Sequence, residues 1–127
     1  MHASLRQVVR KRAKNCCEYC LIRQDQEPLR FHIEHIIPRQ HKGKNTADNL
    51  ALACHHCNRH KGPNLSGIDP RTKKLTRLFH PRLDDWGDHF KNSHGEIMGL
   101  TAVGRTTIGL LRMNEDDRQQ LRETGED

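Results

Sequence analysis

FHIEHIIPRQHKGKNTADNLALACHHCNRHKG, residues 31–62, is the stretch that decides the fold of this 127-residue chain. Alternating apolar and polar side chains at its start, and a shorter apolar run further on, each predict a β-strand. Gly62 and the proline after it mark the end of a short helix. The predicted elements are, in order, a strand (31–37), a polar connection (38–49), a strand (50–53) and a helix within 54–61. This order makes a ββα unit.

Four polar side chains in this stretch stand out by type and position. Glu34 and His35 are adjacent in the first predicted strand, and strict alternation places them on opposite faces. Asn49 immediately precedes the second strand, and Asn58 lies on the predicted helix. By itself the Glu34-His35 pair is typical of an ordinary surface. Together with the two asparagines it indicates a functional site.

Five cysteines accompany the ββα unit, and four of them form two C-x-x-C pairs, Cys17/Cys20 and Cys54/Cys57. An odd total of cysteines, together with two such pairs, favours thiolates on a metal over disulfides. Cys17 is chosen over its neighbour Cys16 because the C-x-x-C turn lets backbone amides point at both sulfurs. A redox-active pair is the competing interpretation, but no βαβ pattern surrounds it.

These residues, in this order, resemble the HNH endonuclease family, whose catalytic unit is a ββα-metal fold, in the form that also carries a four-cysteine zinc site. The resemblance is closest over residues 17–62 and extends more weakly over 64–114. It implies an α+β protein that hydrolyses DNA, with a structural zinc ion on Cys17, Cys20, Cys54 and Cys57. It also implies that Asn49 holds the catalytic loop and orients the histidine.

The chemistry of phosphodiester hydrolysis assigns roles to the remaining residues. A neutral imidazole at His35 is a competent general base at neutral pH. Glu34 and Asn58 offer oxygen ligands to a hard divalent ion, which suits magnesium or manganese. The chain departs from the commonest family pattern at both ligands, with Glu34 where aspartate is more usual and Asn58 where histidine is. Since an amide is a weaker ligand than imidazole for late transition metals, this H-N-N variant favours magnesium or manganese.

Charge is unevenly distributed along the chain, whose net charge is +6. Residues 1–62 carry 12 Lys+Arg against 5 Asp+Glu, whereas residues 63–127 carry 10 against 11. The basic half holds the motif, which suits a polyanionic partner, DNA and most simply a duplex. Arg59 and Lys61 are predicted to contact phosphate. With 33% hydrophobic residues and no long apolar run, the sequence predicts a cytoplasmic protein without a membrane segment.

The rest of the chain is expected to form one domain, 1–127, with the motif. A helix is predicted over 4–14 with Ser4 as N-cap, and a C-terminal extension over 63–127. Within the extension we expect a loop (63–70), a strand or turn (73–79), a hairpin around 92–95, a helix (102–113) capped by Thr101 and a second helix capped by Asn114. Phe79, Trp86 and Phe90 are expected to be core rather than a base-stacking platform.

Two other functions fit parts of the pattern. His32-x-Glu34 followed by Cys54-x-x-Cys57 partly matches the sequence signature of a zinc-dependent nucleobase deaminase. That interpretation gives Cys17 no role. A non-catalytic zinc module could bind nucleic acid through the basic half. The sequence leaves open whether His32 binds metal, contacts phosphate or packs. It also leaves open the target specificity, and whether a monomer nicks one strand or a homodimer cuts two.

Overall fold

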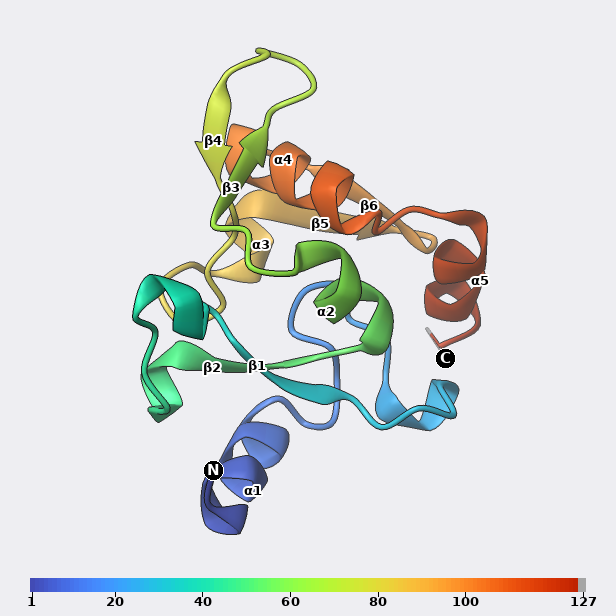
Figure 1. The fold of residues 1–127 in the computed structure, drawn as a ribbon. Coiled ribbons are helices and arrows are strands. Elements are labelled where there is room, and N and C mark those ends of the chain that lie inside the picture. The colour runs from blue at the N-terminus through green and yellow to red at the C-terminus, as the bar shows by residue number, and fades with distance from the viewer. Residues whose placement is uncertain (126–127) are drawn as a thin grey trace.

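The structure is a computed structural model that describes residues 1–125, and it is an α+β fold built from short elements (Figure 1). Its strands pair into three two-stranded antiparallel sheets. The helices are α1 (Ala3–Arg12), α2 (His55–Lys61), α3 (Trp86–His89), α4 (Ala102–Leu111) and α5 (Asp116–Thr124). The strands are β1 (His32–His35), β2 (Leu50–Ala53), β3 (Ser66–Ile68), β4 (Leu75–Arg77), β5 (Phe90–Ser93) and β6 (Glu96–Gly99).

The predicted ββα unit is present as β1, β2 and α2. β1 pairs antiparallel with β2 so that Glu34 faces Ala51 and His35 faces Leu50. The first strand is shorter than the predicted 31–37, because its ladder ends at His35 and the chain then turns into the polar connection. Cys54 is the N-cap of α2, and its sulfur accepts a hydrogen bond from the Cys57 amide, while the C-cap Gly62 has a positive φ.

The hydrophobic core is shared by this unit, the segment that precedes it and the C-terminal extension. All four β2 side chains are buried, as are Tyr19, Ile22 and Phe31. In Figure 1 the loop after α1 passes close to α2 near the centre of the molecule. The core is therefore assembled around the cysteine pairs rather than on one face of a large sheet, which fits the small apolar content of the chain.

The N-terminal helix forms, but its start differs from the prediction. α1 begins one residue earlier, and Ser4 lies inside it rather than capping it. Val9 is fully buried, whereas Val8 is half exposed. Arg12 fixes the helix to the ββα unit, because its guanidinium donates to the carbonyl oxygens of Ala47 at 2.9 Å and Leu50 at 2.7 Å.

The C-terminal extension contains one more strand than predicted, since β3 occupies part of the expected loop 63–70 and pairs with β4. The hairpin β5–β6 and the Thr101 cap are confirmed, and Thr101 Oγ1 accepts from the Gly104 amide at 3.0 Å. The predicted cap of the last helix is wrong. The N-cap of α5 is Glu115, while Asn114 hydrogen bonds to the amide and carbonyl of Ile97, both at 2.8 Å.

The aromatic side chains of the extension are core, as predicted. Phe79 and Phe90 are buried edge to face at 5.1 Å between ring centroids, and Trp86 lies 5.0 Å from Phe90. Trp86 Nε1 also donates to the carbonyl of Tyr19 at 2.9 Å, which joins the extension to the first cysteine pair. Among residues 1–125, none of the helices has the length and apolar character needed to cross a membrane.

Candidate active site and metal centre

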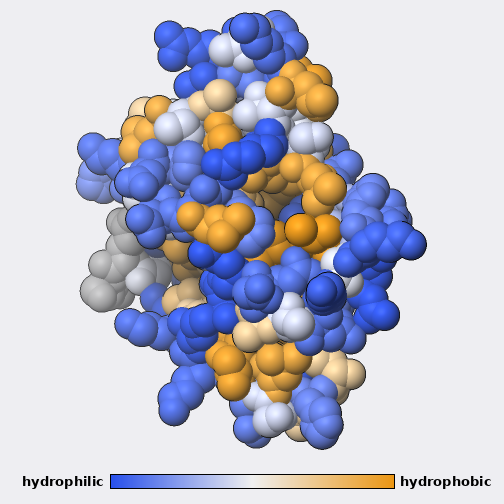
Figure 2. All heavy atoms as spheres, turned by 90° about the vertical axis from the view of Figure 1, so that its left-hand side faces the viewer, coloured by the Kyte–Doolittle hydropathy of each residue, from blue (hydrophilic) through white to orange (hydrophobic). Residues whose placement is uncertain are grey.

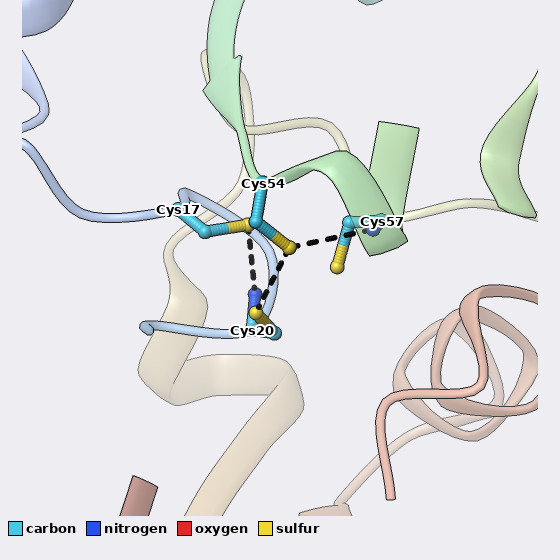
Figure 3. A group of neighbouring side chains, drawn as sticks. All are labelled: Cys17, Cys20, Cys54 and Cys57. Carbon is cyan, nitrogen blue, oxygen red and sulfur yellow. Dashed lines mark hydrogen bonds between the residues drawn. The ribbon is translucent and has the colours of Figure 1, made fainter. Parts of the chain in front are cut away.

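The four predicted cysteines converge on one buried point (Figure 3). Their sulfur atoms all lie within 4.8 Å of one another, and each residue is fully buried. In both pairs the last residue's amide approaches the first sulfur, at 3.5 Å for Cys20 to Cys17 and 3.4 Å for Cys57 to Cys54. This is the turn geometry expected when thiolates are held by amide dipoles.

The donor set fits zinc. A tetrahedral site with Zn–S distances of about 2.3 Å needs sulfurs about 3.8 Å apart. The Sγ atoms of Cys20 and Cys54 are 3.6 Å apart. Hydrogen bonding to Cys17 raises the pKa of both Cys20 and Cys57. A divalent cation would keep all four sulfurs as thiolates and remove this competition for protons. The cluster also gives Cys17 a role that the deaminase interpretation does not provide.

A second polar site lies in an open cleft of about 320 Å³ between β1 and the end of α2. Glu34, His35 and Asn58, predicted from the sequence to act together, all line it. His32 lines it as well, and its Nε2 lies 3.2 Å from His55 Nδ1 on α2. The fold therefore brings a carboxylate, an amide and imidazoles from two elements to one cleft.

Glu34 is the most constrained of these groups, at 6% exposure. Its carboxylate accepts a short hydrogen bond from the Tyr19 hydroxyl and lies 3.3 Å from Lys61 Nζ. Burial raises the pKa of Glu34, and the Lys61 ammonium opposes that rise. Tyr19 lies in the turn of the first cysteine pair, so its side chain links the carboxylate to the cysteine cluster.

Lys61 is the residue that the sequence analysis placed wrongly. The sequence suggests it as a candidate for phosphate contact, but it is 1% exposed. Its ammonium pairs with Glu34 and donates to the carbonyl of Ile36 at 3.1 Å. A buried lysine needs both a counter-charge and hydrogen bonds, and it finds them here. Arg59 is exposed and stays a candidate for phosphate contact.

His35 is held by a side chain that the sequence analysis did not single out. His35 Nε2 lies 2.5 Å from Asn45 Oδ1. An amide oxygen can only accept, so in the neutral imidazole Nε2 carries the proton and Nδ1 has the lone pair. Orientation of the histidine, expected of Asn49, is supplied in this structure by Asn45. The only sequence signal for it is an amide side chain within the polar connection.

Asn49 holds the connection between the two strands, as the family resemblance implied. Its Oδ1 accepts from the Ile37 amide at 2.9 Å, and its Nδ2 donates to the carbonyls of Ile37 at 3.1 Å and Lys44 at 3.0 Å. Gly43 allows this close packing, because a Cβ there would lie 1.6 Å from the Ile37 carbonyl oxygen. One side chain thus closes the loop that carries Asn45.

Basic side chains surround the loop and the N-terminal helix. The exposed ones are Arg6, Lys11, Arg12, Lys14, Arg39, Lys42, Lys44 and Arg59. A second cavity, of about 430 Å³, is lined partly by the loop and partly by His80 and Arg82 of the extension. Figure 2 shows the face on the left-hand side of Figure 1, where the loop lies; it is mostly hydrophilic, with apolar patches around a central hollow. Arg10 is different, because its guanidinium is used to bind the carbonyl of Phe31 at 2.9 Å.

Comparisons with known proteins agree with this site. The family model described as HNH endonuclease matches residues 17–64, which include all four cysteines and the cleft. The chain is 29% identical over 108 residues to the Septu protein PtuB of Bacillus thuringiensis. The match covers 84% of this chain and 39% of that relative, so the chain spans well under half of its length. No solved structure matches the chain.

Proposed function

Residues 17–64 match the family model described as HNH endonuclease, and from that match we propose that this protein is a metal-dependent endonuclease that hydrolyses phosphodiester bonds in DNA. The observation that carries the proposal is the cleft in which Glu34, His35 and Asn58 meet. The buried cysteine cluster is the structural zinc site beneath it. One such cleft per chain supports the nicking of single strands, and two chains or two visits would be needed for a double-strand break.

His35 is proposed as the general base. Asn45 holds the proton on Nε2, so Nδ1 is the atom that accepts a proton from the attacking water. Asn49 and Gly43 keep the loop closed and thereby hold Asn45 in place. Proton transfer requires a heavy-atom distance near that of a hydrogen bond, so this fixed ring orientation supports His35 over the more exposed histidines nearby.

Glu34 and Asn58 are proposed to hold a magnesium or manganese ion at the cleft. When bound, that ion would neutralise a phosphoryl oxygen and the departing 3′ oxygen, which predicts products with 5′-phosphate and 3′-hydroxyl ends. Lys61 and Tyr19 position the Glu34 carboxylate from behind. Each carboxylate oxygen has more than one lone pair, so these contacts leave acceptor capacity for the ion.

DNA is the proposed substrate because exposed cations accompany the motif: Arg39 lines the cleft, and Lys42 and Lys44 lie on the loop. Residues 1–62 have an excess of seven positive charges over negative ones. Each phosphate contacted releases about 0.9 counterions, so the slope of log affinity against log salt counts these contacts. We expect strongly salt-dependent binding with little sequence preference. A slope near zero would remove the electrostatic part of the proposal.

A second function, a zinc-stabilised module that binds nucleic acid without cleaving it, is favoured by one observation. Glu34 is buried and paired with Lys61 rather than pointing freely into the cleft. A carboxylate committed to structure would leave Asn58 as a weak ligand by itself. The two functions differ in one measurable property, because only the nuclease turns over DNA.

The test is incubation of zinc-loaded protein with supercoiled plasmid in chelator, magnesium or manganese. The proposal predicts open circles with magnesium or manganese and none in the chelator, and DNA ligase should reseal them without prior phosphorylation. Ligase requires a 5′-phosphate beside a 3′-hydroxyl, so resealing checks the end chemistry. Salt-dependent binding without nicking in any of the three conditions would favour the binding module.

A further inference from the structure

Two histidines and a glutamate form a cluster that the proposed nuclease does not use. His56 and His60 lie one turn apart on α2, with ring centroids 4.5 Å apart. Glu115, the N-cap of α5, completes the group, and one potential ligand atom from each residue lies within 4.8 Å of the others. These side chains are half buried or exposed, and they lie apart from those that line the cleft.

The tautomer of His56 is set by a backbone contact. His56 Nε2 lies 2.8 Å from the carbonyl oxygen of Arg112. Because a carbonyl can only accept, in the neutral imidazole Nε2 carries the proton and Nδ1 has the lone pair. Histidines that bind metals usually donate their other ring N–H to such an oxygen, which fixes the ring and raises its basicity. This contact is independent of the proximity of the three ligands.

Glu115 is free to take part. Its side chain makes no cap hydrogen bond to α5, although it occupies the N-cap position. Its contact in the structure is with Arg112 Nη1 at 3.8 Å, and both of those side chains are well exposed. An exposed ion pair of this length contributes little to stability. A cation could therefore displace the arginine from the carboxylate at small cost.

We propose that His56, His60 and Glu115 form a second metal site, for a divalent transition ion of the zinc or nickel class. Two imidazoles and one carboxylate are a known ligand set for such ions, with further positions left for water. The site would join α2 of the catalytic unit to α5 of the C-terminal extension. It is distinct from the cysteine site in ligand type and exposure, so it should bind more weakly and exchange faster.

The test uses protein loaded with one zinc on the cysteines and dialysed against a mild chelator. Isothermal titration with zinc chloride, and separately nickel chloride, should reveal one further ion per chain. Loss of a residue that only hydrogen bonds to a metal ligand lowers metal affinity by roughly tenfold or more. His60→Ala and Glu115→Gln each remove a ligand itself, so each should lower the affinity for the second ion by more than roughly tenfold. Both variants should retain the cysteine-bound zinc.

His2→Ala is the matched control, because His2 is exposed and lies outside the cluster. It should bind the second ion as the wild type does. Two results would overturn the proposal: no second binding event up to millimolar metal, or a second event of equal affinity in His60→Ala and Glu115→Gln. Since the readout is metal stoichiometry, the outcome does not depend on whether the protein cleaves DNA.

Discussion

Replacing Lys61 by methionine tests the buried ion pair that supports the cleft. The lysine and glutamate side chains are 2% and 4% exposed, and Lys61 Nζ lies 3.3 Å from Glu34 Oε2. Methionine fills a similar volume but leaves the carboxylate with Tyr19 as its remaining partner. Removing one partner of a buried pair costs about 3–5 kcal/mol. That is a large part of the roughly 5–15 kcal/mol by which proteins of this kind are stable.

The assay is urea unfolding of the zinc-loaded protein near neutral pH, without magnesium. Lys91→Met is the matched control, since Lys91 is exposed, and it should change the free energy of unfolding little. The double variant Lys61→Met/Glu34→Gln removes the buried charge as well, so it should recover much of the loss. A loss below about 1 kcal/mol in Lys61→Met, the size typical of exposed pairs, would refute the reasoning.

The same variant has a predicted pH dependence. Burial already raises the pKa of Glu34 in the folded protein, and loss of the ammonium should raise it further. An acid with a raised folded-state pKa stabilises the fold while it is protonated and loses that contribution as pH rises through the folded pKa. The loss in Lys61→Met should therefore grow with pH. An equal loss at pH 5 and pH 8 would contradict a role for the Glu34 charge.

Three further predictions follow from other parts of the fold. Cys17→Ser should lose zinc and the cooperative thermal transition, because metal binding contributes directly to folding in small zinc domains; unchanged melting with zinc retained would contradict the cysteine site. Gly43→Ala should disrupt the loop and reduce nicking while zinc stays bound, whereas Gly109→Ala, with open space around its Cβ, should be neutral or stabilise α4. Asp69 accepts two hydrogen bonds from Arg105, and these hold its pKa well below the ordinary 3.8. The ionised Asp69 therefore stabilises the fold above pH 3.8, and this stabilisation is lost as pH falls below it. In Asp69→Asn the free energy of unfolding, followed by circular dichroism, should depend less on pH in the acid range.

The ββα unit and the cysteine site were predictable from the sequence because their signals are local. β2 matches its predicted bounds, and the helix of the unit, α2, ends at Lys61 with Gly62 as its C-cap, as expected. The C-x-x-C spacing fixes each turn whatever surrounds it. The family match, over residues 17–64 of the chain, covers these same elements.

What the sequence did not reveal depends on contacts between distant segments. A lysine is almost always exposed, and nothing local to Lys61 indicates that Glu34 lies against it. Tyr19 hydrogen bonds to Glu34, and Asn45 hydrogen bonds to His35. The pattern of apolar and polar residues along the chain does not indicate either contact. Asn114 has the side chain of a good N-cap, yet the edge of β6 offers its amide two backbone partners, and that tertiary contact prevails.

The central claim is that His35 is the base of a nuclease, and the most direct measurement is the single-turnover rate of plasmid nicking by His35→Ala. Wild type and His41→Ala, an exposed histidine outside the cleft, serve as references with magnesium or manganese. We predict that His35→Ala is slower by a factor of about 10²–10⁴, with DNA binding and zinc content unchanged. Cleavage by His35→Ala at the wild-type rate would contradict the account.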